Sequence, residues 1–302
     1  MSYDFVEQNP LPLLDRLRLA LEEDLGTAGD VTSAALVPES RHAEGIFLAK
    51  ANGIVSGTAV LAPVFELTRA LTRANDDTHV EILKPDGDSV KKGDAIARVK
   101  GPARVLLSGE RTALNLLCHL CGVATKTSQF AKKIAHTRAK VLDTRKTTPI
   151  WRDLEKHAVK CGGGENHRFA LYDMVLIKDN HLALWNANDP AGAVREAKKK
   201  FPNLRVEVEV VSLNGLQQVC NESNADMVLL DNFSVEGLRE AVKWSDEFFS
   251  ANKEKSRPLL EASGGVTMET LVAIAETGVD RISVGALTHS VGSLDVSLEI
   301  IF

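Results

Sequence analysis

The sequence predicts an α/β protein, in which an incomplete, open α/β barrel follows an N-terminal domain that mixes helices with short strands. From residue 139 onward, short apolar runs alternate with longer segments of helical periodicity, which is typical of βαβ units and a parallel sheet. Six such runs are too few for a closed eight-stranded barrel. No G-x-G-x-x-G follows the first run, which disfavours a doubly wound dinucleotide-binding sheet.

Composition narrows the class of protein. The chain has 302 residues, 44% of them hydrophobic and 25% charged, with a net charge of −5, as expected for a globular protein of two domains or of one large barrel with an appendage. The acidic balance argues against a nucleic-acid partner. No apolar run is long enough to span a bilayer, and residues 1–20 lack the apolar core of a secretory signal. We therefore expect no membrane association and a cytoplasmic location.

The N-terminal part predicts helices around a small β-rich layer. The expected elements are a helix at 11–25, two strands within 45–61 forming a hairpin at Asn52-Gly53, a helix at 63–74, strands and tight turns over 79–105, and a helix at 108–135 interrupted by Gly122. Arg111 falls in the first turn of that last helix. The strand-and-turn segment is weakly similar to biotinyl and lipoyl modules, but it lacks a lysine at an exposed hairpin tip, so a plain β-rich layer is favoured.

The barrel half is read as alternating strands and helices. The predicted strands are 140–144, 174–178, 205–211, 227–231, 259–263 and 281–284. The predicted helices between them are 149–160, 189–201, 213–223, 235–250 and 268–277. On the first of these helices we expect Arg152 and Lys156 to form a solvated face.

Cysteines and isolated histidines give no metal signal. Cys118 and Cys121 form a C-x-x-C inside a helical apolar pattern, while Cys161 and Cys220 stand alone. Without a second ligand pair, packing cysteines are favoured over a zinc site. The histidines without a visible partner, for which structural or surface roles are expected, are His119, His136, His157 and His289.

Polar residues follow each barrel strand at the point where it ends. They are Asp143, Arg145 and Lys146 after the first strand, Lys178 and Asp179 after the second, Glu209 on the third, Asp231 and Asn232 after the fourth, Ser263, Gly264 and Gly265 after the fifth, and Gly285 after the sixth. Functional residues of α/β barrels lie at the carboxyl ends of the strands. The sequence therefore predicts one site at that edge.

The residue types at this edge suit a strongly anionic ligand. Arg145 and Arg168 are suited to clamping carboxylates, because a guanidinium donates two parallel hydrogen bonds. Lys146 and Lys178 supply point charges, and His167 a hydrogen bond. The glycine loops at Ser263–Gly265 and Gly285, the former preceding a helix, predict a phosphate site. Glu209 and Asp231 suit ribose hydroxyls or Mg²⁺ bound through water, whereas a salt bridge inside the barrel is favoured for Glu207.

The motifs resemble the quinolinate phosphoribosyltransferase family nearly from end to end. They are EEDLGTAGDVTS (22–33), GERTALNLL (109–117), DTRKTTP (143–149), EKHAVKCGGGENHR (155–168), LIKDNH (176–181), EVEV (207–210), LLDNF (229–233), EASGG (261–265) and ISVGALTHS (282–290). The resemblance implies an N-terminal α+β sandwich domain at 1–116, completed by the tail 288–302, and a barrel domain at 117–287. The run Gly162–Gly164 is then a hinge that delivers His167 and Arg168.

The resemblance also implies a reaction. The family transfers phosphoribose from phosphoribosyl pyrophosphate to the ring nitrogen of quinolinate with decarboxylation, and it requires Mg²⁺. By position, Arg111, Arg145, Lys146, His167, Arg168 and Lys178 match quinolinate-binding residues, and Glu209, Asp231, Ser263, Gly264, Gly265 and Gly285 match residues around ribose, metal and phosphate. Catalytic roles are implied for Lys146, Lys178, Glu209 and Asp231. Arg111 matches an arginine that reaches the neighbouring subunit's site, which implies a homodimer, in turn compatible with a trimer of dimers.

Two departures and two rival functions stay open. Ile150-Trp151 stands where many relatives have Gly-Leu, and Ala170 where Gly is common. The rivals are a related transferase that acts on a different acid or serves metal-oxoanion uptake, and a non-catalytic barrel that binds an anionic metabolite. A monoacid needs fewer cations than this cluster provides, and the acidic pair with the phosphate loops disfavours a non-catalytic barrel.

Overall fold

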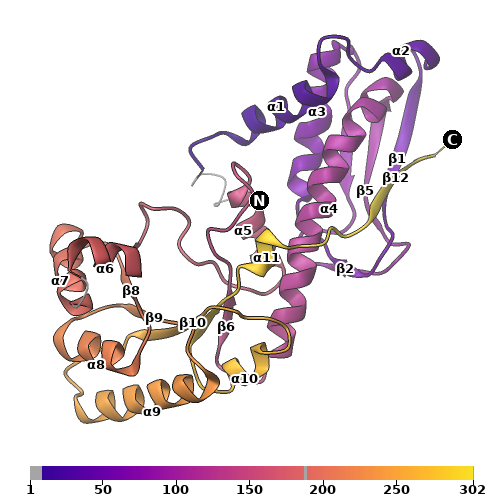
Figure 1. Ribbon diagram of the computed structural model, residues 1–302. Coiled ribbons are helices and arrows are strands. Elements are labelled where there is room, and N and C mark those ends of the chain that lie inside the picture. Colours follow the sequence, from indigo (N-terminus) through magenta and orange to yellow (C-terminus); the bar gives the residue numbers. More distant parts are fainter. Residues whose placement is uncertain (1–8, 187–188, 302) are drawn as a thin grey trace. The chain divides into compact units, whose positions relative to one another are not determined.

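The computed structural model describes residues 9–186 and 189–301, and its contacts divide the chain into two compact units (Figure 1). The first unit comprises Met1–Ser128, Thr147–Gly163 and Leu287–Phe302, and the second comprises Gln129–Lys146 and Gly164–Ala286. Among the described residues, no helix is both long and apolar enough to cross a membrane. Whether 1–116 and 117–287 are separate folding domains stays a prediction.

A four-stranded antiparallel sheet is the base of the first unit. Its order is β12-β1-β5-β3, with bounds β1 His42–Ala49, β3 His79–Ile82, β5 Ala95–Pro102 and β12 Val296–Ile301. The C-terminal strand thus pairs with β1, Ala49 opposite Val296. Two short strands, β2 (Gly53–Ile54) and β4 (Ser89–Val90), form a separate pair.

Helices complete the first unit and bury its apolar side chains. They are α1 Leu13–Leu25, α2 Val31–Leu36, the 3-10 turn η2 Thr58–Val60, α3 Leu61–Thr72, α4 Ala103–Lys133, which continues into the second unit, α5 Arg152–Cys161 and α11 Ala286–His289. Phe47 of β1 and Phe65 of α3, both fully buried, meet with ring centroids 6.2 Å apart. Burial of large aromatic surfaces of this kind supplies much of a core's stability.

Two predictions for the first unit are wrong, and both misread a glycine. No hairpin forms at Asn52-Gly53, because β1 pairs with β5 and β12 whereas β2 pairs with β4. A side chain at Gly53 would lie 2.6 Å from Thr125, so this glycine permits close packing rather than a turn. Gly122 does not interrupt α4, which is continuous. A Cβ there would lie 2.4 Å from the carbonyl oxygen of Gly292.

The second unit is a six-stranded parallel sheet with the order β6-β11-β10-β9-β8-β7. Its strands are β6 Lys140–Leu142, β7 Val175–Ile177, β8 Val206–Val210, β9 Met227–Asp231, β10 Leu259–Ser263 and β11 Arg281–Ser283, at the predicted places. The first strand pairs with the last, Lys140 opposite Arg281, whereas β6 and β7 do not pair. This is the predicted barrel, open between its first two strands.

The helices of the second unit flank the strands (Figure 1). They are α6 Asp179–Trp185, α7 Pro190–Lys200, α8 Leu213–Glu222, α9 Val235–Ala251 and α10 Leu271–Ala275. Serine N-caps begin two of them: the hydroxyls of Ser212 and Ser234 accept hydrogen bonds from the backbone N–H groups of Gly215 and Gly237. Helix α6 was not predicted, because its apolar residues are too few to show periodicity.

Helix α5 belongs to the first unit, although it lies in sequence between the first two barrel strands. Its buried Asp153 forms an ion pair with Arg16 of α1 at 2.7 Å, and its buried Glu155 meets His119 of α4, also at 2.7 Å. The predicted solvated face is wrong for Lys156, which is 2% exposed. An amphipathic pattern shows that a helix packs against something, but it does not identify the partner.

The departure at Ile150 has a structural consequence just before α5. Ile150 has a φ of 64°, in the left-handed region that a β-branched side chain adopts only under strain. Its carbonyl oxygen accepts a 2.6 Å hydrogen bond from Arg16, whose guanidinium also lies over the Trp151 ring at 5.2 Å. A Gly at this position would adopt the same φ without strain.

Candidate functional site

The predicted edge exists in the second unit. Asp231 lies opposite Ser263 in the β9–β10 register, and Glu209 lies opposite Leu229, two residues before Asp231. Asp143 follows β6 and Lys178 follows β7 directly. Because all six strands are parallel, these residues gather at the carboxyl edge of one sheet. Arg111 is not among them: it lies on α4 in the first unit, with its side chain 64% exposed and Glu110 at 3.9 Å.

Four of the predicted cations belong to this edge. Arg145 and Lys146 are exposed on the loop after β6, and Lys178 is exposed after β7. Arg168 is half-buried, and burial together with the positive charge of Arg145 lowers its pKa. The two guanidinium groups are therefore close enough to repel. Arg168 donates from Nη1 to the carbonyl oxygen of Met174 at 3.1 Å, while its buried Nε has no hydrogen-bond partner among the described residues.

His167 lies deeper, inside the barrel, between two buried glutamates. Its Nε2 is 3.0 Å from Glu207 and 3.3 Å from Glu261, and its side chain is 7% exposed. Burial lowers the pKa of His167, but the hydrogen bonds and charges of the two carboxylates outweigh burial and raise it to about 9. The salt bridge predicted for Glu207 is thus confirmed, with His167 as its partner.

We define His167, Glu207 and Glu261 as the His167 cluster. The Nδ1 atom of His167 also contacts the backbone N–H of Arg168, at 2.7 Å. Burial and the charge of Glu261 raise the pKa of Glu207. Arg281, whose Nε lies 3.6 Å from Glu261, adds a positive charge beside the two carboxylates. This pairing avoids an uncompensated charge in the barrel.

Backbone contacts fix the segment that carries His167. The buried carboxylate of Asp143 accepts a 2.9 Å hydrogen bond from the backbone N–H of His167. Glu165 bridges to Leu142 at the open edge of β6. With both ring nitrogens engaged, His167 would have to release a partner before it could bind an acid directly. Its predicted contact with quinolinate stays a prediction.

Glu261 lies in the EASGG motif, and the sequence predicted no role for it. Burial raises its pKa, but the hydrogen bond and charge of His167, the hydrogen bond from Ser283 and the charge of Arg281 together outweigh burial and lower it. Ser283 donates a short hydrogen bond to the same carboxylate. A sequence signal was present: Glu207 and Glu209 are two residues apart, as are Glu261 and Ser263, so each pair faces the barrel interior on one strand.

Glu209 and Asp231 form an acidic pair on neighbouring strands. Burial and then the charge of Asp231 raise the pKa of Glu209, and Lys178 is 3.9 Å from its carboxylate. Two half-buried carboxylates with one loosely placed ammonium leave a surplus of negative charge. Such a pair fits Mg²⁺, which binds through one or two carboxylates and keeps several waters.

The glycine loops offer backbone donors rather than a helix dipole. Gly264 and Gly265 have φ values of 96° and 59°, and a Cβ on Gly264 would lie 2.1 Å from the side-chain oxygen of Asn232. Successive residues of this kind form a concave nest of N–H groups that suits an anion. The expected helix contribution is wrong here, because α10 begins only at Leu271 and has five residues.

A second histidine cluster lies in the first unit, around a histidine for which the sequence shows no partner. His157 Nε2 is 3.0 Å from Asp86 and 3.3 Å from the Cys161 sulfur. Burial lowers the pKa of His157, but hydrogen bonds to Asp86 and Cys161 outweigh burial and raise it to about 9. The spacing His157-x-x-x-Cys161 on one helical face was the available sequence signal.

Two further histidines and both cysteines of the C-x-x-C also have partners in the structure. His119 pairs with Glu155 and His136 with Glu276, the latter at 3.2 Å, which agrees with the structural or surface roles expected for them. The sulfur of Cys121 bonds the backbone of Ser56 at 3.3 Å, and burial raises the pKa of its thiol to about 12. Cys118 bonds the carbonyl oxygen of Val296 at 3.8 Å. These contacts agree with packing cysteines.

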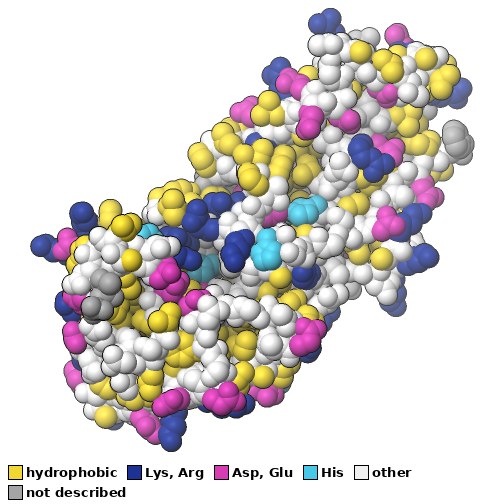
Figure 2. Space-filling model, viewed as in Figure 1, with side chains coloured by type: hydrophobic (Ala, Val, Ile, Leu, Met, Phe, Trp, Pro, Cys, Tyr) yellow, Lys and Arg dark blue, Asp and Glu magenta, His cyan; other side chains and the backbone are white. Residues whose placement is uncertain are grey.

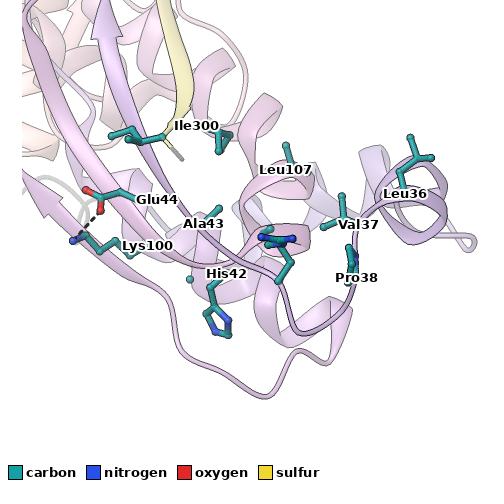
Figure 3. Close-up of a pocket in the computed structure, with 13 residues that line it drawn as sticks. Leu36, Val37, Pro38, His42, Ala43, Glu44, Lys100, Leu107 and Ile300 are labelled. Atoms are coloured by element: carbon teal, nitrogen blue, oxygen red, sulfur yellow. Dashed lines mark ion pairs between the residues drawn. The ribbon is translucent and has the colours of Figure 1, made fainter.

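A cavity of about 970 Å³ lies elsewhere in the first unit (Figure 3). Apolar side chains such as Leu36, Val37 and Leu107 line it, together with the ion pair of Glu44 and Lys100 at 3.0 Å. None of the residues predicted for the site lines this cavity. The visible face of the molecule carries basic and acidic side chains interspersed (Figure 2). The site therefore rests on the strand edge of the second unit.

Known proteins match this fold and sequence over nearly the whole chain. The family model of the quinolinate phosphoribosyl transferase C-terminal domain matches residues 123–299, and that of the N-terminal domain matches residues 30–121. The chain belongs to the quinolinate phosphoribosyltransferase family. The resemblance seen in the sequence motifs is confirmed.

Individual relatives are similar at the level of sequence and structure. A probable nicotinate-nucleotide pyrophosphorylase (carboxylating) of Bacillus subtilis is 41% identical over 298 residues, covering 97% of this chain and 94% of the relative. One of Methanocaldococcus jannaschii is 40% identical over 288 residues, covering 94% and 96%. The solved nicotinate-nucleotide pyrophosphorylase of Francisella tularensis is 36% identical with a TM-score of 0.83, covering 100% of this chain and 98% of that one. The predicted fold class is thereby confirmed.

Proposed function

We propose that this chain transfers the 5-phosphoribosyl group of phosphoribosyl pyrophosphate to the ring nitrogen of quinolinate, with loss of the 2-carboxylate. The products are nicotinate mononucleotide, pyrophosphate and CO₂, in the de novo biosynthesis of NAD. The observation that carries the proposal is one strand edge that combines four cations, an acidic pair and two glycine loops, in a chain of this family.

The acid half of the proposed site is the cationic cluster after β6 and β7. Arg145 and Arg168 bind the two carboxylates of quinolinate, and the spare Nε donor of Arg168 supplies one of the hydrogen bonds. The repulsion between the two guanidiniums, which lowers the pKa of Arg168, is relieved when a dianion enters. Lys146 and Lys178 add point charges beside the acid and the leaving group.

The phosphoribosyl half lies on β8 to β11. The loops of Ser263, Gly264 and Gly265 and of Gly285 present backbone N–H groups to the 5-phosphate. Glu209 and Asp231 hold the ribose hydroxyls and would bind Mg²⁺ through water, and the bound ion would neutralise charge on the departing pyrophosphate.

The chemistry needs electrostatics and positioning but no protein nucleophile. The bond between the anomeric carbon and the pyrophosphate oxygen breaks as the ring nitrogen bonds that carbon, and positive charge develops on the ribose. Glu209 and Asp231 stabilise that charge. The pyridinium formed then accepts the electron pair left when the 2-carboxylate departs as CO₂, and the vacated ring carbon takes up a proton.

An activity assay tests the function and separates the rivals. Purified protein is incubated with quinolinate, phosphoribosyl pyrophosphate and Mg²⁺, and nicotinate mononucleotide and CO₂ are measured. Product from nicotinate but not from quinolinate would favour the rival transferase. Binding of the anions without turnover would favour the non-catalytic barrel. Arg145→Ala and Arg168→Ala should each weaken quinolinate binding by about 1.5–3 kcal/mol, measured by calorimetry, while phosphoribosyl pyrophosphate binding changes little.

The same proposal includes a homodimer with shared sites, open to assembly as a trimer of dimers, in the cytoplasm. Its support is Arg111, which is exposed on α4 and which matches a family residue that reaches the neighbouring subunit's site. Inactive Arg111→Ala and Lys146→Ala subunits should recover activity when mixed, since half of the shared sites then contain both native residues. Demonstrated mixed dimers without activity would exclude a shared site.

A further inference from the structure

Three side chains of the first unit hold metal-binding atoms close together. Asp86 comes from the turn between β3 and β4, and His157 and Cys161 lie one helical turn apart on α5. Their carboxylate oxygen, Nε2 and Sγ all lie within 4.8 Å of one another. None of the three belongs to the predicted site, so the proposed function leaves this cluster unexplained.

The two contacts at His157 Nε2 compete with each other. A ring nitrogen carries either one proton or one lone pair, so it forms one well-directed hydrogen bond. Asp86 at 3.0 Å requires a proton on Nε2, whereas a thiol of Cys161 donating at 3.3 Å requires the lone pair. A cation in the middle would satisfy the oxygen, the nitrogen and the sulfur together.

The two separations measured from His157 Nε2 are close to those around a tetrahedral ion. Ligand atoms about 2.0–2.3 Å from Zn²⁺ lie roughly 3.3–3.7 Å apart at tetrahedral angles. The observed separations from Nε2, 3.0 Å to oxygen and 3.3 Å to sulfur, need to open by only a few tenths of an ångström. The imidazole and thiolate donors favour zinc-class ions over Mg²⁺ or Ca²⁺.

Asp86 is held in place in the way that ligating carboxylates usually are. Its Oδ1 accepts hydrogen bonds from the backbone N–H of Thr58 at 3.0 Å and from the Thr58 hydroxyl at 2.7 Å. Its Oδ2 accepts a 3.0 Å bond from the backbone N–H of Gly57. Such outer partners orient a ligand before metal arrives. The side chains of Asp86 and His157 are 12% and 21% exposed, which leaves access for an ion and for a water ligand.

We propose that Asp86, His157 and Cys161 form a binding site for one divalent transition metal ion of the zinc class, with water as the fourth ligand. The ion would connect α5 to the turn that carries Asp86 within the first unit. The proposal concerns metal binding alone, so it stands or falls independently of the transferase activity.

The test uses the full chain, freed of metal by a chelator and kept reduced, with Zn²⁺ and Co²⁺ as probes. The native protein should retain one Zn²⁺ after desalting, and Co²⁺ should produce the absorption of a thiolate-to-cobalt charge transfer. Cys161→Ser should abolish that absorption, and His157→Gln or Asp86→Asn should weaken Zn²⁺ binding at least about tenfold. Cys118→Ser, which removes a half-buried thiol outside the cluster, is the matched control and should behave like the native protein.

Two results would overturn the proposal. One is Co²⁺ binding without thiolate absorption in the native protein. The other is equal Zn²⁺ retention by Cys161→Ser, which would place the ion elsewhere, for example at the His167 cluster or the acidic pair. A second measurement covers a variant that fails to fold: in the native protein, Zn²⁺ should slow alkylation of Cys161 at least about tenfold but leave Cys118 unchanged, as read by mass spectrometry. Equal alkylation rates with and without Zn²⁺ would also overturn it.

Discussion

Two histidines ten residues apart sit in similar surroundings in different units of the molecule. His157 contacts Asp86 and Cys161 in the first unit, and His167 contacts Glu207 and Glu261 in the second. Partners that outweigh burial raise the pKa of both rings to about 9. The two differ in depth and in the kind of partner. His157 has a carboxylate and a sulfur and is 21% exposed, whereas His167 has two carboxylates and is 7% exposed.

That difference indicates different tasks. The His167 cluster has its own counter-ion, Arg281, and the backbone N–H of Arg168 also contacts the imidazole ring. Removing one member of the cluster would therefore leave a buried charge without its partner. The set of Asp86, His157 and Cys161 is partly accessible to solvent and includes a soft sulfur donor, which suits reversible binding of a metal ion. A raised pKa alone therefore does not distinguish a permanent internal scaffold from a site open to a ligand.

The largest expected effect is the loss of Glu261. Glu261→Ala should destabilise the protein by about 3–5 kcal/mol, because Arg281 would remain in the barrel without its carboxylate. Urea unfolding followed by circular dichroism measures the change. As a control, Glu247→Ala, which removes an exposed helical pair with Lys243, should change stability by less than about 0.5 kcal/mol. A small effect at Glu261 would mean that the barrel interior tolerates an unpaired guanidinium.

Stability should also fall as pH rises past neutrality. The folded-state pKa of His167, about 9, lies above the unfolded value of 6.5, so its contribution is complete below pH 6.5 and is lost as pH passes through about 9. The expected loss is on the order of 2–3 kcal/mol. Unfolding free energies of the native protein and of His167→Gln between pH 6 and 10 should converge with rising pH. Parallel curves would show that the cluster does not hold its extra proton.

Substitution of Asp86 should destabilise the protein less than the loss of Glu261. Asp86→Asn keeps an oxygen for the Thr58 donors but loses the charge opposite His157, so a destabilisation of about 1–2 kcal/mol is expected in metal-free protein. Asp77→Asn, at an ion pair with Arg69 in which Asp77 is 93% exposed, serves as a control that should show no measurable change. A loss as large as that of Glu261→Ala would remove the contrast between the two clusters.

The smallest effect is expected for Cys161→Ser without metal. A half-buried thiol contributes only a weak hydrogen bond to His157, so stability should change by less than about 0.5 kcal/mol. With saturating Zn²⁺, the melting temperature of the native protein should rise above that of the variant. If the two melting temperatures stay equal with Zn²⁺, the thiol makes no contribution to metal binding.

The barrel was predictable from the sequence because each of its strands is a short apolar run that ends in polar residues. The register then places Glu209, Asp231 and Ser263 together, since parallel strands share one carboxyl edge. Glycine roles were not predictable at Gly53 and Gly122. Both are required by a neighbour distant in sequence, and local pattern carries no information about that neighbour.

The histidine clusters show the same limit of local sequence patterns. Asp86 and His157 are 71 positions apart, and nothing near either residue indicates that they meet. The sequence did not predict that α5 packs in the first unit for the same reason, because Asp153 and Arg16 form their ion pair across 137 positions. Residue type was enough to predict which groups suit an anion, and that role stays a prediction, whereas the buried pairing of the two histidines depends on the tertiary fold.

The opening between β6 and β7 has a consequence for how the chain folds. Strands β7 to β10 each pair with the next strand along the chain, so that part of the sheet can grow through local steps. Strand β6 comes first in the sequence of the second unit, but its strand partner there is the last one, β11, with Lys140 opposite Arg281. Its bridge to Glu165 is an isolated one. Closing the long loop between β6 and β11 is slow. Until it occurs, the loop with Arg145 and Lys146 is not fixed by the pairing of β6 with β11, so we expect this loop to be among the last parts of the second unit to become ordered.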